Sequence, residues 1–400
     1  MKSYKIYLAY SLTLLFSILF STQNSTSIPS FARKYQISCQ VCHAPAIPRL
    51  KAFGEEFAAN GFRMTDYDSP RYFVSTGDEK LSLLRELPLA IRMDGFASYS
   101  FDSGSGDFQS PYVLKILSGG EISDKLSYYF YFLFNERGSV AGVEDAFLMY
   151  HDLFKTGVNF YIGQFQVSDP LFKGELRYTL EPYKIYGVKP GNSLADLKYD
   201  RGVIFEKDFK TGTTVVGEVL NGCGIGAAGE EALFDHDIYK NYMLRINQSI
   251  TKNISLGVFG YAGKEFLNDT WTGTSTGVYN KIRMIGPDLS IDFDSKFILN
   301  VQYVRRMDSQ VYDGLFVEKD VKTQGGFAEI TYSPKGDMSN WYLTGLFNWV
   351  DSDLTELNYR AATFHAGYIL RRNLRVVGEF TQQLSGRSYG RVNAGFVAAF

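Results

Sequence analysis

The chain has 400 residues, of which 21% are charged, and a formal net charge of −2. This near-neutral charge argues against a nucleic-acid partner, and the charged fraction is too ordinary for a disordered chain. A mean hydropathy of −0.14 excludes a bundle of membrane helices, whereas 32 Phe, 28 Tyr and 38 Gly favour all-β structure, either soluble or in a membrane.

Residues 1–27 are typical of a secretory signal peptide. Lys2 and Lys5 precede an apolar run over 8–20 that is short for a membrane span, and the small polar residues at 21–27 suit cleavage. The alternative is an uncleaved membrane anchor. No apolar run directly precedes Cys39, so a lipoprotein is not expected.

The segment Cys39-Gln40-Val41-Cys42-His43 has the spacing of a c-type haem attachment motif. Two thiols separated by two residues can each bond one vinyl group of a haem, and the adjacent His43 then reaches the iron as an axial ligand. A redox dithiol or zinc site is the alternative, but no second Cys pair or His pair follows. We therefore expect one haem c, held by Cys39, Cys42 and His43.

A short helix is expected after this motif, from Pro48 to a stop at Asn60-Gly61. Leu50, Phe53 and Phe57 recur at helical spacing and would cover one haem face or form an ordinary apolar stripe. Met64, the next sulfur along the chain, is the expected distal haem ligand, with core filling as the alternative. This haem segment, residues 28–80, is too small to bury a haem by itself.

From residue 88 to residue 400 the sequence alternates with period two. In the last strand, Val392, Ala394, Phe396, Ala398 and Phe400 share one face, and Arg391, Asn393 and Gly395 share the other. The stretches 126–134, 297–306 and 341–349 repeat this pattern of an aromatic face and a polar face. A soluble sandwich turns its apolar face inward, whereas a transmembrane barrel turns it toward lipid and keeps a polar lumen.

Loop lengths favour the barrel. Short connections are expected near 121–124, 208–211, 249–252, 292–295, 334–338 and 371–373, and longer ones near 102–111, 166–198, 222–237, 263–276, 307–323 and 351–358. Short periplasmic turns and long outer loops characterise bacterial outer-membrane barrels. We predict an antiparallel outer-membrane β-barrel of about sixteen strands, with both termini on the periplasmic side.

A barrel of this size has a wide lumen, and we expect the small α-helical haem segment to plug it. The loop at 166–198 either folds inward or stays exposed. His365 is predicted to face the lumen and to be the only barrel histidine positioned to meet a haem on the plug, since His151 falls at a periplasmic turn and His236 on an outer loop. It is therefore the alternative to Met64 as distal ligand, although a hydrogen bond to its neighbours is the commoner fate of a lumen histidine. Lumen-facing charges are expected to pair along the wall: Arg92, Asp94, Arg245, Glu329, Arg375 and Glu379.

Two further groups have weaker signals. Asp351, Asp353 and Glu356 would attract ferrous ions at the outer surface or, more commonly for such clusters, are solvated loop residues. Cys223 is expected to be a free thiol without a role.

The order of these features resembles the fused outer-membrane cytochrome–porins, the monohaem iron oxidases of iron-oxidising bacteria. The likeness rests on Cys39, Cys42 and His43 and on the pattern P-x-L-x-x-F-G-x-x-F-x-x-N-G over residues 48–61. It implies localisation in the outer membrane of a Gram-negative bacterium, extracellular Fe(II) as electron donor and a periplasmic c-type cytochrome as acceptor. Such a protein would act as an Fe(II):cytochrome c oxidoreductase by electron transfer.

Two other functions fit the sequence. One is a diffusion porin whose haem segment is a sensor or regulator, and the other is a conduit that carries electrons outward to extracellular acceptors. A conduit needs a closed lumen, and a porin needs an open one.

Overall fold

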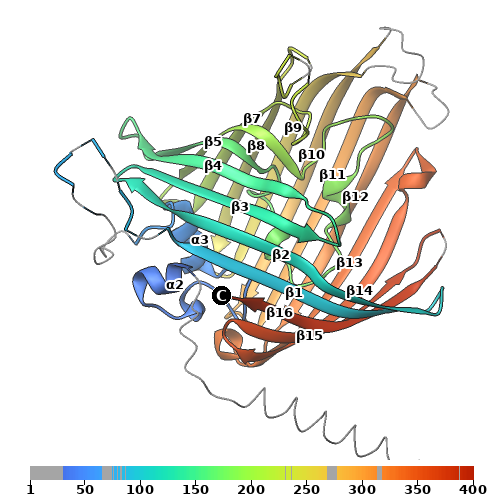
Figure 1. Cartoon of the computed structure of the whole chain (residues 1–400). Helices are drawn as coiled ribbons and strands as arrows, with labels where there is room; N and C mark the ends of the chain where they lie inside the picture. The colour runs from blue at the N-terminus through green and yellow to red at the C-terminus, as the bar shows by residue number, and fades with distance from the viewer. Residues whose placement is uncertain are drawn as a thin grey trace, which may run out of the picture.

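The computed structural model describes residues 30–64, 74, 76–78, 80–81, 83–85, 87–229, 231–235, 237–267, 277–312, 318–386 and 388–400. The expected signal peptide, residues 1–27, lies outside the described residues. No helix in the described part of the chain is long and apolar enough to cross a membrane. Figure 1 shows one large barrel with short helices at one of its mouths.

Sixteen antiparallel strands form the closed barrel, in which each strand pairs with its neighbours in the chain and β1 pairs with β16. The strands are β1 Leu89–Ser100, β2 Ser105–Ser123, β3 Leu126–Glu136, β4 Gly142–Leu153, β5 Val158–Gln166, β6 Tyr199–Asp208, β7 Thr213–Leu220, β8 Asn241–Thr251, β9 Ile254–Leu267, β10 Val278–Phe293, β11 Phe297–Tyr312, β12 Glu318–Tyr332, β13 Trp341–Ser352, β14 Tyr359–Arg371, β15 Leu374–Gln383 and β16 Gly390–Ala399. Closure leaves no unpaired strand edge. The expected all-β fold and strand count are confirmed.

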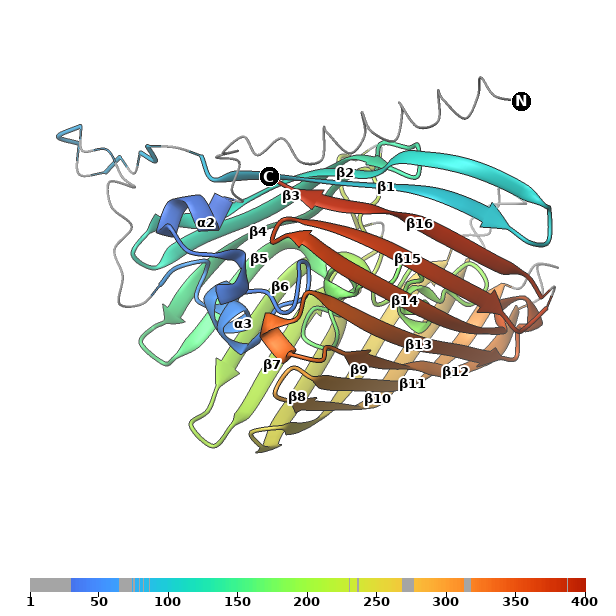
Figure 2. The same cartoon turned by 90° about the horizontal axis from the view of Figure 1, so that it is seen from below.

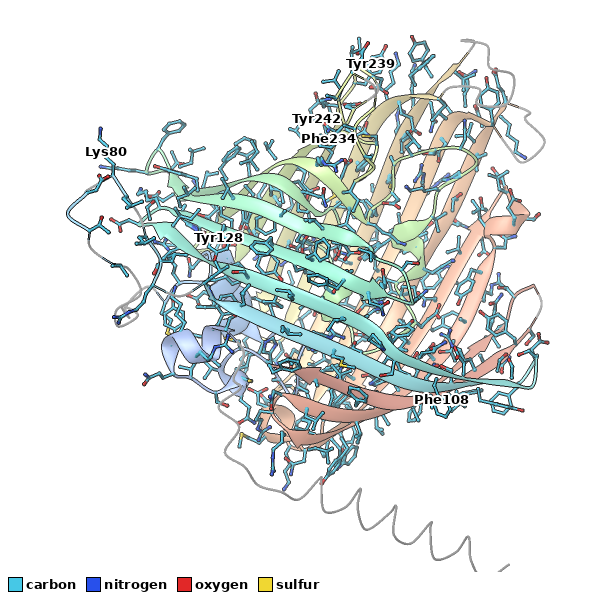
Figure 3. All side chains as sticks on the ribbon, in the orientation of Figure 1. Lys80, Phe108, Tyr128, Phe234, Tyr239 and Tyr242 are labelled. Carbon is cyan, nitrogen blue, oxygen red and sulfur yellow. The ribbon has the colours of Figure 1, made fainter. Side chains whose placement is uncertain are left out.

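The two faces of the wall follow the alternation in the sequence. In β13, Tyr342 is 0% exposed toward the lumen, whereas Phe347 is 41% exposed on the outside. Near the mouth that holds the helices, Phe297, Tyr332 and Trp341 form an outer row with ring centroids 4.7 and 5.9 Å apart. Such aromatic girdles border the lipid-facing band of outer-membrane barrels. In Figure 3, sticks cover this outer surface, with Tyr128 labelled on the wall.

An apolar outer band around a closed, polar-lined wall is the arrangement that a bilayer requires, because every backbone group is paired within the barrel. The chain is therefore a multi-pass β-barrel of the outer membrane.

The connections at the two ends differ. Short turns lie at the mouth where the chain enters and leaves the barrel: 124–125, 154–157, 209–212, 252–253, 294–296, 333–340 and 372–373. By the usual sidedness of outer-membrane barrels, this mouth is periplasmic. The 333–340 turn contains the short helix η4 Gly336–Met338, and the opposite connection between β13 and β14 contains η5 Thr355–Leu357.

Three connections that we predicted to be long are shorter than expected. The first is a turn over 101–104, and β2 begins at Ser105. Strand β9 runs on to Leu267, into the first of the other two expected loops, 263–276. Strands β11 and β12 include 307–312 and 318–323 of the second, 307–323. The added end of β12 carries outward polar residues such as Asp320 and Lys322, so it lacks the apolar outer face by which strands were recognised.

The connection between β5 and β6, residues 167–198, folds into the barrel, and we call it the lumen segment. It contains η2 Gly174–Leu176 and η3 Lys184–Gly187. Its buried residues Val167, Ile185 and Leu197 belong to one apolar cluster with wall residues such as Phe259 and Phe327. The inward reading of this loop is therefore confirmed, and the middle of the barrel is filled by protein.

Residues 30–64, which we call the plug segment, lie at the periplasmic mouth (Figure 2). They contain α2 Ser30–Tyr35, η1 Cys39–Val41 and α3 Ala52–Ala59. We predicted that the helix begins at Pro48, but it begins at Ala52, because an isolated antiparallel β-bridge between His43 and Leu50 closes a loop of bends and turns over the residues between them. Phe57 is buried as expected, whereas Phe53 is 39% exposed.

Candidate haem-attachment site

The two thiols of the site lie on a single tight turn. The side chain of Ser38 caps η1 by accepting a hydrogen bond from the backbone N–H of Gln40. The amide of His43 then donates to the carbonyl of Cys39 at 2.9 Å, so the motif residues form one compact loop. Cys39 and Cys42 are both half-buried and carry free thiols, as attachment of a haem requires.

The imidazole of His43 is fixed by its Nδ1 atom. This atom lies 3.1 Å from the carbonyl oxygens of both Pro48 and Arg49, so the ring carries its proton on Nδ1 and donates it to the backbone. Burial lowers the pKa of His43, which favours the neutral ring. A neutral imidazole with Nδ1 bound to a carbonyl presents Nε2 as the ligand atom, which is the form that iron binds.

Burial also sets the state of the thiols. It raises the pKa of Cys39, and it raises the pKa of Cys42 to about 11. Reactive dithiols of redox proteins have lowered pKa values instead. Cys39 and Cys42 therefore lack the lowered thiol pKa of such redox sites.

Helix α3 packs directly on the motif. A Cβ atom at Gly54 would lie 2.3 Å from the carbonyl oxygen of Cys42, so the first turn of the helix approaches the loop as only glycine allows. The exposed ring of Phe53 lies next in the chain and stacks with Phe57 at 6.5 Å. Paired thiols, a neutral histidine and a neighbouring apolar ring together fit a covalently bound haem.

Wall and lumen-segment residues hold the motif in place. Nη1 of Arg49 donates to Glu329 at 3.3 Å and to Thr331 at 3.0 Å, both on the inner face of β12. The hydroxyl of Tyr178, in the lumen segment, donates to the carbonyl oxygens of Ala44 and Ala46 at 3.2 and 3.1 Å. No local sequence pattern predicts the roles of Arg49 and Tyr178, because their partners are more than a hundred residues away.

The predicted pairing of the lumen charges is confirmed for one pair. Nη2 of Arg92 lies 2.7 Å from Asp94. The other predicted wall charges have different partners. Arg245 pairs with Asp288 at 2.7 Å, Glu329 binds the plug, and Glu379 accepts backbone N–H bonds from Leu180 and Glu181. The wall charges thus anchor the plug and the lumen segment as well as one another.

The far end of α3 contacts the opposite side of the wall. The ring of Phe62 stacks on Tyr129 of β3 at 4.9 Å, and Asn159 of β5 donates to the carbonyl of Ala59. Met64 follows, and its backbone lies at the Tyr35 hydroxyl. The first turn of α3 packs on Cys42, whereas Met64 follows the other end of this helix. The role of Met64 as distal ligand stays a prediction.

The histidines of the barrel differ in part from expectation. His365 faces the lumen, as predicted, and is 1% exposed. Both its ring nitrogens have partners, Glu379 at 3.0 Å and Tyr342 at 3.4 Å. These hydrogen bonds are the commoner fate expected for a lumen histidine. A role for His365 as the distal ligand of a haem on the plug segment stays a prediction. His151, buried in β4, is the histidine that abuts this segment: a Cβ atom at Gly61 would lie 2.2 Å from its Nε2. His236 lies outside the described residues.

The weaker candidates show no assembled site. Asp351 pairs with Arg360 at 2.9 Å, and Asp353 accepts the backbone N–H of Lys322. Within the described ranges, no group of three or more His, Cys, Asp or Glu residues is placed to hold a metal ion. The Sγ of Cys223 contacts the carbonyl of Phe234, on the loop at the extracellular end where Figure 3 labels Phe234.

Solved structures with the same architecture are outer-membrane proteins. A loop-deletion form of OmpT from Vibrio cholerae has a TM-score of 0.55 at 11% identity, and the match covers 79% of this chain and 99% of that one. OmpF of Salmonella typhi has a TM-score of 0.54 at 13% identity, with 78% and 97% covered. The DcaP channel of Acinetobacter baumannii has a TM-score of 0.53 at 13% identity, with 79% and 97% covered.

The chain has the porin fold. No family model matches the sequence, and no curated protein matches it either. At these identities the likeness concerns the fold alone. The site on the plug segment is therefore understood from its own residues.

Proposed function

We propose that this porin-like barrel is an outer-membrane electron-transfer protein of the fused cytochrome–porin type. In this proposal, one haem c is bound through Cys39 and Cys42, with His43 as axial ligand. Extracellular Fe(II) is the electron donor and a periplasmic c-type cytochrome is the acceptor, so the protein acts as an Fe(II):cytochrome c oxidoreductase.

The observation that carries this proposal is the setting of His43. Its ring is held by two backbone carbonyls, its neutral form is favoured by burial, and it lies beside two free thiols on one tight turn. The turn is fixed to the periplasmic mouth by Arg49 and Tyr178. A periplasmic cytochrome would reach a group bound here from the mouth at which the chain enters and leaves the barrel.

The packed lumen supports electron transfer over free diffusion of solutes. The rings of Tyr183 and Phe327 stack with centroids 3.9 Å apart, and Tyr186 contacts the same Phe327 ring at 5.7 Å. Tyr178, which contacts the motif, packs against Tyr342 with ring centroids 4.1 Å apart. Electrons can cross a dense interior, whereas hydrated solutes need a continuous aqueous path.

The chain's own residues would position the group and exclude water. A bound haem supplies one reversible electron, at a potential set by its axial ligands and surroundings. Nδ1–H of His43 keeps the ring in one tautomer, which orients the ligand nitrogen and raises its basicity. Gly54 allows α3 to cover the turn, and Phe53 offers an apolar contact beside it.

A second candidate function is diffusion of small solutes with a haem-bearing regulatory segment, which the porin fold favours. Conductance across a planar bilayer distinguishes the two. An electron conduit with a packed lumen gives no stable open-channel steps, and a diffusion porin gives them. The reduction potential of the haem distinguishes the direction of electron transfer. A high potential favours uptake of electrons from Fe(II), and a low potential is expected for a conduit that carries electrons outward.

The test begins with expression alongside a c-type haem maturation system. Covalent haem is detected on denaturing gels by peroxidase staining, and the purified protein is then mixed with Fe(II) while the haem absorbance is recorded. We expect Cys39→Ala and Cys42→Ala to abolish covalent haem and Cys223→Ala to retain it. The proposal fails if the parent protein carries no covalent haem, or if its haem is not reduced by Fe(II) at any pH at which the barrel is folded.

A further inference from the structure

A cavity of about 80 Å³ lies inside the barrel between the lumen segment and the wall formed by β1, β2, β3, β14, β15 and β16. It is separate from the thiols of the plug. A single buried water needs only about 10–15 Å³ on this measure, so the cavity has room for several waters or for one small polyatomic ion. Its lining is polar and rich in cations.

Five basic side chains line the cavity, against three acidic ones. The basic residues are Arg92, Lys115, Arg137, Arg177 and Arg375, and the acidic residues are Asp94, Glu136 and Glu175. Two of the basic residues are already neutralised within the lining: Arg92 lies 2.7 Å from Asp94, and Lys115 lies 2.6 Å from Glu175. The positive charge in excess therefore resides on the other arginines.

Arg375 is the decisive group. Its side chain is on the inner face of β15 and is 2% exposed. It donates to the Tyr342 hydroxyl, and its Nε has no hydrogen-bond partner in the described part of the chain. The guanidinium also lies over the ring of Tyr178, 5.1 Å from the centroid. A buried guanidinium N–H without an acceptor is unfavourable, and an anionic oxygen in the cavity would supply that acceptor.

Arg177 presents a second guanidinium from the opposite side. It follows η2 in the lumen segment, and its Nη1 donates to the carbonyl of Gly174 at 2.5 Å. Its Nε is buried and also lacks a partner in the described part of the chain. The two arginines thus approach one cavity from the wall and from the lumen segment, each with a free N–H group.

The cavity reaches the surface at the connection between β3 and β4. Arg137, in this connection, is exposed and lines the cavity, and its guanidinium lies 5.5 Å from the ring centroid of Tyr112. This connection is at the end opposite the plug. A ligand would therefore enter from the extracellular side.

We propose that this cavity is a binding site for a small oxyanion, such as phosphate, sulfate or a short carboxylate. The planar N–H donors of arginine match the oxygens of these groups. Charge-assisted hydrogen bonds from guanidinium to an anionic oxygen are stronger than hydrogen bonds between neutral groups. An oxyanion held between Arg177 and Arg375 bridges the lumen segment to the wall. The site is independent of any group bound at Cys39 and Cys42.

Titration calorimetry on the purified full chain in detergent tests this site, with sodium phosphate, sodium sulfate and sodium acetate as separate ligands and chloride held constant. We expect saturable binding of at least one oxyanion. Arg177→Gln should weaken it roughly tenfold or more, the loss expected for one charge-assisted contact. Arg283→Gln, an outward residue on β10, is the matched control and should bind as the parent does.

The comparison among the three ligands identifies the oxyanion class. If Arg177→Gln does not fold, Arg137→Gln provides the test at the exposed end, where we expect weaker binding without loss of the fold. Absence of saturable binding for all three oxyanions overturns the proposal. Equal affinity in the parent, the cavity variant and Arg283→Gln overturns it as well.

Discussion

Nη1 of Arg49 in the plug segment lies 3.3 Å from Oε1 of Glu329 on the inner face of β12, with the Glu329 side chain only 1% exposed. The same carboxylate accepts a hydrogen bond from Tyr183 of the lumen segment at 2.9 Å. One wall residue therefore holds both internal segments. Arg49 and Glu329 are far apart in the sequence, and they meet because the plug segment packs against the inner face of β12.

Replacement of this carboxylate should loosen the plug. Glu329→Gln leaves Arg49 buried without its charge partner, and we expect a loss of about 3 kcal/mol in the free energy of unfolding. Thermal unfolding and hydrogen exchange of the plug amides measure it. Asp351→Asn, which breaks an exposed ion pair with Arg360, should change stability by less than about 1 kcal/mol. Equal effects of the two variants would argue against an anchoring role for Glu329.

A methyl group at Gly54 should disturb the attachment loop. In Gly54→Ala the added Cβ would overlap the carbonyl oxygen of Cys42, so α3 has to move away from the thiols. We expect a reduced yield of covalent haem, measured by peroxidase staining relative to total protein. Gly226→Ala, where an added Cβ meets nothing within 4 Å, is the control and should give the parent yield.

The sequence predicted the strands of the barrel wall better than the contacts inside the barrel. The alternation that placed Tyr342 inward and Phe347 outward is a local signal, set by the pleat of one strand. The end of β12 near Asp320 and Lys322 carries outward polar residues, so it lacks that signal and was predicted to be a loop. Cys39, Cys42 and His43 were recognisable because their chemistry depends on spacing, whereas Tyr178 contacts the motif through a fold that no local pattern encodes.

Acid should weaken the attachment of the lumen segment to the wall. Burial alone would raise the pKa of Glu175, but the charges of Lys115 and Arg177 lower it to about 2 from 4.5. A lowered folded-state pKa stabilises the fold above about pH 4.5, and this stabilisation is lost as the pH falls toward 2. We expect about 3 kcal/mol to disappear over that interval.

Thermal melts at a series of pH values check this dependence. Glu175→Gln removes the titrating group, so its stability should vary less with pH between 2 and 4.5 than that of the parent. An unchanged slope in Glu175→Gln would show that other carboxylates cause the acid sensitivity.

The distal ligand predicted from sequence is tested by spectroscopy. If the sulfur of Met64 binds the iron, Met64→Ala removes a thioether ligand, and the reduction potential and the absorbance of the oxidised haem both change. Met338 is the matched control. Its sulfur lies 3.8 Å from the side chain of Gln40, a residue that stands between Cys39 and Cys42 in the sequence. A spectral change in Met338→Ala but not in Met64→Ala would contradict the prediction.

The central claim is that electrons pass from Fe(II) outside, through a group on the plug segment, to a cytochrome on the periplasmic side. Vesicles that contain the haem-loaded protein and enclose a soluble c-type cytochrome test it most directly. Fe(II) is added outside together with a chelator for Fe(III), and the absorbance of the enclosed cytochrome is followed. We predict reduction of the enclosed cytochrome with the parent protein and none with Cys39→Ala/Cys42→Ala. The account is contradicted if the parent protein leaves the cytochrome oxidised, or if the double variant reduces it equally fast.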